Sequence, residues 1–250
     1  MFEDQRVLAV VPARSASKGI PNKNMQPLAG TSLIGWAGKV LAQLPWIDCR
    51  ILSTDSEAYA AEGRQFGLEA PFLRPDALST DTASGVDVVE HALKSMETLS
   101  KQVFDVILII EPTSPLRTAA DIEQTTRCLL NAKADSAVTV SPLPSKFHPL
   151  KVLQIDRTQL GFYTKQGRSI VNRQSLPPLY WRNGVCYAVR RCCLLEQHTV
   201  FGQRCVAVVI EHPVVNIDEP WELEWAQYQL EHGAVSGEGL PTGDKGGVLT

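Results

Sequence analysis

The side chains best suited to chemistry lie in a basic loop near the start of the chain, PARSASKGIPNKN. This loop has no acidic residue, and Gly19 lets backbone amides come close to a bound anion. Cations held away from bulk water stabilise the charge that grows on a leaving pyrophosphate. The pattern therefore favours phosphate binding by the three cations of the loop, which are Arg14, Lys18 and Lys23.

On its own, the basic loop does not identify an enzyme class. It matches neither G-x-x-x-x-G-K-[ST], the phosphate loop of NTP hydrolases, nor G-x-G-x-x-G, the fingerprint of dinucleotide-binding dehydrogenases, so both classes lose support. A solvated basic turn without a ligand is the alternative interpretation. The six cysteines form no C-x-x-C pair, so we expect reduced thiols and no structural zinc.

Strand and helix patterns alternate along the chain and place the basic loop directly after the first strand. Nearly continuous apolar runs predict buried strands, and apolar residues at helical spacing predict helices. The predicted strands are 7–11, 50–53, 106–110, 137–140, 206–210 and 214–217. The predicted helices are 33–44, a second that starts from a Thr54–Glu57 capping box and ends at Gly67, then 86–96, 122–130 and 220–230.

This alternation predicts an α/β fold, with a mostly parallel sheet covered by helices in a Rossmann-like arrangement. Ligands of such folds bind beyond the carboxyl ends of the strands, so the candidate site is built from the loops that follow them. From about residue 143 to 205 the helical period disappears, and hairpins are expected to interrupt the sheet. We interpret 1–232 as a single domain with a β-rich insert at about 143–205 that serves dimerisation, and 233–250 as a flexible tail.

Composition excludes several classes of function. The chain has 250 residues, and 24 Lys and Arg against 27 Asp and Glu give a net charge of -3, which supplies no global field for nucleic acid or an anionic membrane. No apolar run approaches the roughly 20 residues that a bilayer span requires. The first residues, MFEDQR, carry acids where a signal peptide needs basic residues, so we expect a cytoplasmic protein.

The chain resembles the acylneuraminate cytidylyltransferases, or CMP-sialic acid synthetases, over roughly Val7 to His232. The resemblance rests on blocks that occur in the order seen in that family: VPARSASKGIPNKN, FLRPDALSTDTASG, EPTSPLRT, RQSLPPLYWRNGVCY and VNIDEPWEL. It implies a nucleotidyltransferase-like fold and transfer of CMP from CTP to the anomeric hydroxyl of a nine-carbon 2-keto-3-deoxy sugar acid. Pyrophosphate would be released, and magnesium would be required.

The resemblance also implies roles for single residues. Arg14 and Lys23 would contact the triphosphate, with Lys18 beside them in the same loop. The nucleotide would be recognised by Asn24, Arg74 and Ser84, whose charge and donors suit that task. Asp218 follows a predicted strand where the family holds magnesium, and a carboxylate is a ligand that this hard cation prefers. The alternative for Asp218 is a helix cap before Pro220.

Two departures from the family pattern concern metal and sugar. The family commonly shows Asp-x-Asp at the late site, whereas this chain has Asn216 before Asp218, so the second metal ligand would be a neutral oxygen. Glu111 stands where the family has Gln beside its sugar, and a carboxylate there would repel the substrate's own carboxylate unless it is protonated, paired or turned toward metal. Local pairing of Glu111 with Arg117 is the other interpretation.

The insert resembles the part of the family in which residues cross into the partner's site of a homodimer. The candidates there for contact with the substrate are Lys151, Arg173, Gln174 and Asn183, which offer cations and amides.

Other functions remain as alternatives. A Kdo-type or other sugar nucleotidyltransferase would share the fold and the metal. A glycosyltransferase would be expected to show Asp-x-Asp, which this chain lacks. A non-catalytic nucleotide-binding relative is hinted at only by Asn216. The sequence does not name which of the sialic, legionaminic or pseudaminic acids is used.

Overall fold

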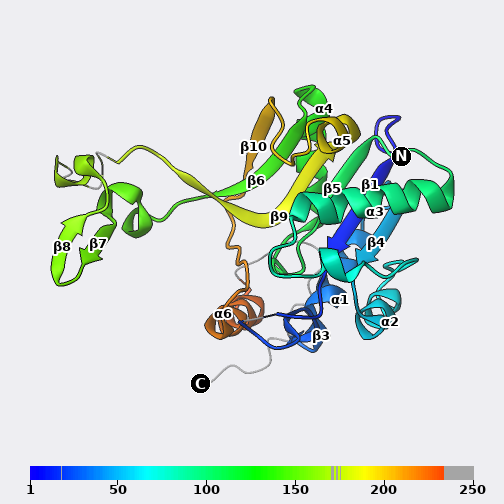
Figure 1. Ribbon diagram of the computed structural model, residues 1–250, viewed down its shortest axis with the longest axis horizontal. Coiled ribbons are helices and arrows are strands. Elements are labelled where there is room, and N and C mark those ends of the chain that lie inside the picture. Colours follow the sequence, from blue (N-terminus) through cyan, green and yellow to red (C-terminus); the bar gives the residue numbers. More distant parts are fainter. Residues whose placement is uncertain (18, 170–171, 173, 175, 234–250) are drawn as a thin grey trace, which may run out of the picture.

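A six-stranded sheet forms the centre of the molecule in the computed structural model, which describes residues 1–17, 19–169, 172, 174 and 176–233 (Figure 1). The strand order is β10-β6-β9-β5-β1-β4. The strands are β1 (Val7–Pro12), β4 (Cys49–Ser53), β5 (Val106–Ile109), β6 (Ser136–Pro142), β9 (Tyr180–Arg190) and β10 (Cys205–Val209). Two small antiparallel sheets pair β2 (Pro27–Leu28) with β3 (Thr31–Ser32), and β7 (Leu153–Asp156) with β8 (Gln159–Phe162).

The predicted α/β fold with a mostly parallel sheet is confirmed. β1 runs parallel to both β4 and β5, and β10 runs parallel to β6. β9 is antiparallel to β5 and β6, between which it lies. Because β9 reverses direction, the start of this strand meets the carboxyl ends of β1 and β5 at one edge of the sheet.

Helices cover both faces of the sheet, so the side chains of β1, which point alternately to the two faces, are buried against helices. Val7, Ala9 and Val11 pack in the core cluster that includes α1 and α4, whereas Leu8 and Val10 pack in the cluster that includes α3 and α5. Burial on both faces explains the continuous apolar run of β1. The helices are α1 (Leu33–Ala42), α2 (Glu57–Gln65), α3 (Gly85–Ser100), α4 (Ala119–Asn131), α5 (Arg191–Glu196) and α6 (Pro220–Glu231).

Local side-chain caps fix where several helices begin. The capping box predicted for Thr54 and Glu57 is wrong, because α2 begins after Ser56, whose hydroxyl accepts from the Tyr59 amide. Thr54 instead accepts from the Ser56 amide in the turn before the helix. A capping box does start α4 at Thr118, and a box of two glutamates starts α6 at Glu219.

The expected insert at 143–205 is shorter in the structure. Residues 180–190 form β9 inside the main sheet, and α5 follows directly, so the part that leaves the body runs from 143 to 179 (Figure 1). We call residues 143–179 the arm. Its strands β7 and β8 form the expected hairpin. The short helices η3 (Ser145–Phe147) and η4 (Pro149–Lys151) precede the hairpin, and η5 (Lys165–Ser169) follows it. The strand predicted at 214–217 is absent, because these residues run as an extended loop.

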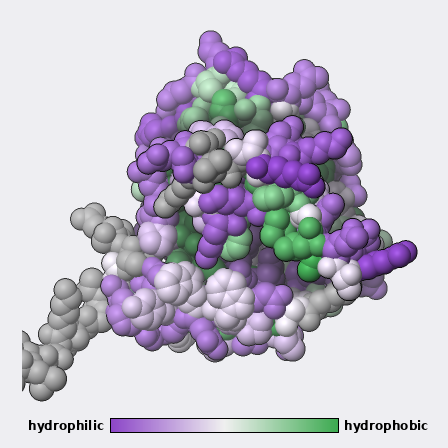
Figure 2. All heavy atoms as spheres, turned by 90° about the vertical axis from the view of Figure 1, so that its left-hand side faces the viewer, coloured by the Kyte–Doolittle hydropathy of each residue, from purple (hydrophilic) through white to green (hydrophobic). Residues whose placement is uncertain are grey.

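The arm exposes apolar side chains within this chain. Ile155 and Leu160 are 73% and 66% exposed, and Phe147, Leu153, Phe162 and Tyr163 are exposed as well. Figure 2, which views the molecule from the side of the arm, shows hydrophobic residues bordered by hydrophilic ones on this face. The predicted tail lies outside the described residues apart from Gly233. No helix in the described part of the chain has the length and apolar content needed to cross a membrane.

Candidate active site

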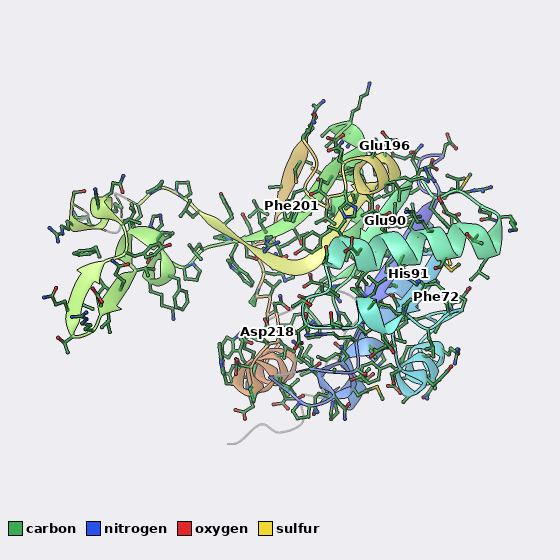
Figure 3. All side chains as sticks on the ribbon, viewed as in Figure 1. Phe72, Glu90, His91, Glu196, Phe201 and Asp218 are labelled. Atoms are coloured by element: carbon green, nitrogen blue, oxygen red, sulfur yellow. The ribbon has the colours of Figure 1, made fainter. Side chains whose placement is uncertain are left out.

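A cavity of about 870 Å³ opens at the carboxyl ends of β1 and β5, the place predicted for ligands. Its walls come from the loop after β1, the loop before α3, the turn after β5, the start of β9, and the segments around Phe201 and Asp218 (Figure 3). The structure brings seven predicted residues together around it: Arg14, Lys23, Asn24, Arg74, Ser84, Glu111 and Asp218.

The basic loop is held by two aspartates from other parts of the chain. The Arg14 guanidinium pairs with Asp81 across 2.7 Å. Asp55, which follows β4, accepts hydrogen bonds from both the amide and the hydroxyl of Ser15, each at 2.8 Å. These neighbouring groups therefore fix the first residues of the loop.

Lys23 and Asp218 connect the first and last loops of the site. The Lys23 ammonium lies 2.7 Å from an Asp218 carboxylate oxygen, although 195 residues separate them. Lys23 is mostly buried, with 17% of its side chain exposed, while the Asp218 side chain is 69% exposed. Gly19 permits this contact, since a Cβ there would stand 2.6 Å from the backbone oxygen of Asp218.

The predicted nucleotide-binding residues form one flank of the cavity. Asn24 is buried and donates from its amide nitrogen to the Arg14 carbonyl. Arg74 is also buried, its Nε donates to the Ser79 hydroxyl, and burial lowers its pKa. Ser84 is exposed and caps α3 by accepting from the Val86 amide. Fixed donors at the start of a helix suit recognition of a polar, anionic ligand.

Glu111 lies two residues after β5 and lines the cavity. Burial raises the pKa of its carboxyl, and nearby Arg117 and Arg182 oppose that shift. The suggested side-chain pairing of Glu111 with Arg117 is not found. The Arg117 guanidinium is buried and donates to the backbone carbonyls of Glu111, Gly184 and Val185, and so ties the turn after β5 to β9.

The late loop contributes one exposed carboxylate and one buried amide. Asp218 lines the cavity, and the Asp218 amide donates to Glu222 of α6. The Asn216 Oδ1 is buried and has no hydrogen-bond partner among the described residues. An exposed carboxylate two residues from an unpartnered amide oxygen is a donor set that suits magnesium. In the described ranges no group of three or more acidic, His or Cys side chains could hold a metal by itself.

The structure does not bring Lys151, Gln174 or Asn183 to the cavity of this chain. Asn183 is completely buried, where its side chain donates to Ser141 and accepts from the Val185 amide, so no surface is left for a ligand. Lys151 and Gln174 are exposed on the arm. Lys18 and Arg173 lie outside the described residues.

Several cavity residues were missed by sequence reasoning. Arg182 and Tyr187 come from β9, and Phe201 comes from the segment after α5, where Arg182 lies over its ring with 5.4 Å to the centroid. Asp81 falls within the block FLRPDALSTDTASG, and Asp55, which holds Ser15 outside the cavity wall, lies two residues after a predicted strand, so their positions were the available signal. The pairing of each one required the fold.

Comparisons with known proteins agree with this geometry. The model of a family described as "Cytidylyltransferase" matches residues 8–212. The chain is 29% identical to the CMP-N,N'-diacetyllegionaminic acid synthase of Legionella pneumophila, over 88% of this chain and 94% of that protein. It is 25% identical to the pseudaminic acid cytidylyltransferase of Campylobacter jejuni, over 90% and 97%.

A further sequence relative matches over only part of its length, and a solved structure superposes over nearly all of its length. The N-acylneuraminate cytidylyltransferase of Escherichia coli is 29% identical over 88% of this chain, but the match spans only 51% of that protein. A solved CMP:2-keto-3-deoxy-manno-octonic acid synthetase complexed with CTP superposes with a TM-score of 0.66, over 91% of this chain and 99% of that chain, at 18% identity. The structural likeness supports the fold.

Proposed function

Because the chain belongs to the cytidylyltransferase family, we propose that it transfers CMP from CTP to the anomeric hydroxyl of a nine-carbon 2-keto-3-deoxy sugar acid. It is a nucleotidyltransferase, and pyrophosphate is the second product of the proposed reaction. The names of the legionaminic, pseudaminic and acylneuraminic acid relatives support this class of acceptor. The observation that carries the proposal is the convergence of Arg14, Lys23 and Asp218 on one cavity.

In the proposed mechanism, the basic loop binds the triphosphate. Arg14 and Lys23 exchange their carboxylate partners for phosphate oxygens and stabilise the charge that develops on pyrophosphate. Lys18 is assigned the same role from its place in the loop. Asn24, Arg74 and Ser84 orient the nucleotide on the flank beside the loop, where hydrogen bonds already hold their side chains.

Magnesium is proposed as the cofactor, with Asp218 as its principal protein ligand. When bound, the ion would neutralise phosphate charge and polarise the reacting phosphorus. Asp218 supplies an exposed carboxylate at the cavity, and Asn216 supplies a neutral oxygen two residues earlier. Phosphate oxygens and water would complete the coordination, because this cation usually keeps few protein ligands.

A homodimer is proposed from the exposed apolar surface of the arm. Side chains such as Ile155 and Leu160 leave water only if a second surface covers them. The arm also holds the predicted sugar contacts Lys151, Arg173 and Gln174, which are assigned to the partner's cavity rather than to that of their own chain. Asn183 is not carried forward, since it is buried within the sheet.

The proposed function is tested by pyrophosphate release with CTP, magnesium and a panel of sugar acids. We expect turnover with at least one of sialic, legionaminic and pseudaminic acid, and much slower release when UTP or ATP replaces CTP. Preference for Kdo would favour the alternative acceptor instead. Absence of release with every acid would refute the proposal, and comparable release with ATP would refute the nucleotide assignment.

The metal assignment has its own test, in the variant Asp218→Asn. We expect near loss of turnover and a matching loss of Mn²⁺ binding measured by electron paramagnetic resonance in the presence of CTP. Asn216→Asp should be tolerated, and it should lower the magnesium concentration needed, since it adds a charged oxygen beside Asp218. Full activity of folded Asp218→Asn would overturn the assignment.

A further inference from the structure

The proposed reaction needs a group that accepts a proton. The sugar hydroxyl becomes an ester oxygen on the α-phosphorus of CTP, so its proton has to leave during or after attack. We propose that Glu111 is the base that takes this proton, an inference that rests on the function proposed above.

The position of Glu111 is the first argument. It lies two residues after β5, the strand beside β1, and it lines the same cavity as Lys23 and Asp218. The charges of Arg117, Arg182, Asp218 and Lys23 all act on its carboxyl. Glu111 therefore lies within electrostatic reach of the proposed phosphate and metal groups and of Arg182 in β9.

The second argument is the state of the other carboxylates in the cavity wall. Among the described residues these are Asp81, Asp218 and Glu219. Asp81 is paired with Arg14, Asp218 is paired with Lys23, and Glu219 belongs to the capping box that starts α6. Within the described part of the chain, Glu111 is the carboxylate of this wall for which the structure shows no hydrogen bond or ion pair through its side-chain oxygens. A substrate hydroxyl that reaches its carboxylate therefore has no hydrogen-bond partner to displace among the described residues.

The environment of Glu111 strengthens it as a base. Burial raises the pKa of its carboxyl, and Asp218 acts in the same direction, while Arg117, Arg182 and Lys23 oppose the shift. Burial, with a smaller contribution from Glu111, also raises the pKa of Tyr187, which lines the same cavity, to about 12. A carboxylate whose pKa moves toward neutral pH holds a proton better than an ordinary surface glutamate.

Gly184 leaves room for the Glu111 carboxyl because it has no Cβ. This residue of β9 has φ +69°, and a Cβ there would collide with a Glu111 carboxylate oxygen and stand 2.8 Å from the Ser114 hydroxyl. The Glu111 carboxyl thus rests against bare backbone. The backbone around it is fixed by the Arg117 hydrogen bonds to the carbonyls of Glu111 and Gly184.

In the proposed transfer, one bond to phosphorus forms as another breaks, and Glu111 takes the proton that is released. The hydroxyl oxygen forms the bond to the α-phosphorus, and the bond from that phosphorus to the bridging oxygen of pyrophosphate breaks. Pyrophosphate leaves with the electron pair. The hydroxyl proton moves to a Glu111 carboxylate oxygen and then passes to water.

The main test is the variant Glu111→Gln, which keeps shape and polarity but does not accept a proton at the amide in this range of pH. With the best sugar acid of the panel, we expect kcat to fall by about 10²-fold or more while the KM for CTP stays within about threefold. The acidic limb of the kcat profile of the wild type should be lost. Glu211→Gln makes the same charge change outside the cavity wall and should leave kcat unchanged.

A second variant, Glu111→Ala, tests proton transfer by rescue. Formate or acetate should restore part of kcat, with a dependence on the concentration of the anion form, and chloride at equal ionic strength should not. A purely positioning role would leave the acidic limb in place and show no rescue, which would overturn the inference. If the wild type releases no pyrophosphate with any acid, the proposed function itself fails, whereas an active wild type with a fully active Glu111→Gln refutes the inference alone.

Discussion

Gly19→Ala should separate the two loops that meet beneath the cavity. The backbone oxygen of Asp218 would stand 2.6 Å from the new methyl carbon, whereas ordinary contacts begin near 3.4 Å. The loops must therefore part by about 0.8 Å, the difference between these distances. The atom in contact is backbone, so the clash is not relieved by rotation of a side chain.

The consequence for activity follows from the Lys23–Asp218 contact. A displacement of this size would lengthen the 2.7 Å ion pair and move the proposed metal ligand relative to the basic loop. Misplacement of reacting groups by about 1 Å costs on the order of 10²-fold in rate, so we expect kcat/KM to fall by about 10- to 100-fold. The strain should lower the free energy of unfolding by about 1–3 kcal/mol.

The assay is pyrophosphate release under saturating magnesium, together with a thermal melt. Gly85→Ala provides a matched change on the same cavity wall, because a Cβ there meets nothing within 4 Å. The control should retain activity and stability much better than Gly19→Ala. If Gly19→Ala keeps wild-type kcat/KM, or if both variants lose activity equally, the reasoning from the Asp218 clash is wrong.

Other contacts lead to predictions of the same kind. Lys23→Met should raise the affinity of the CTP-free enzyme for Mn²⁺ several-fold, because the ammonium competes with a cation for Asp218. The same variant should bind CTP more weakly. Unchanged Mn²⁺ affinity in titrations followed by electron paramagnetic resonance would contradict this prediction. The hydrogen bond between His212 and Asp121 raises the pKa of His212 above its ordinary 6.5. Burial alone would raise the pKa of Asp121, but the hydrogen bonds from His212 and Thr118 lower it below 3.8. The stabilisation by this pair should therefore be complete between about pH 4 and 6.5 and be lost as pH rises through the folded pKa of His212. His212→Asn should cost about 1 kcal/mol in denaturant unfolding near pH 6 and almost nothing near pH 9, and an equal cost at both pH values would rule the pair out. Ile155→Lys should shift a dimer toward monomer in light scattering at micromolar concentration, and an unchanged mass would argue against the arm as the interface.

The sequence by itself determined the fold class and much of the cavity wall. A buried strand such as β1 is recognised in the sequence by a continuous apolar run, and a helix such as α3 by apolar residues at helical spacing. Both patterns are local consequences of burial. Loops that follow parallel strands converge at one edge, so placing Arg14 and Glu111 after strands was enough to bring them together.

Only the tertiary structure decided which of these groups meet. β9 lies antiparallel between β5 and β6, and no pattern in its residues records that choice of neighbours. Asn183 was predicted to contact the substrate, whereas in the fold it is buried and donates a hydrogen bond to Ser141. The prediction could not foresee this, because Asn183 lies in β9 and its neighbours depend on the strand order. The Lys23–Asp218 contact joins residues 195 positions apart. Periodicity reports how a segment is buried, whereas pairing across the chain depends on sheet order and close backbone approaches such as that at Gly19.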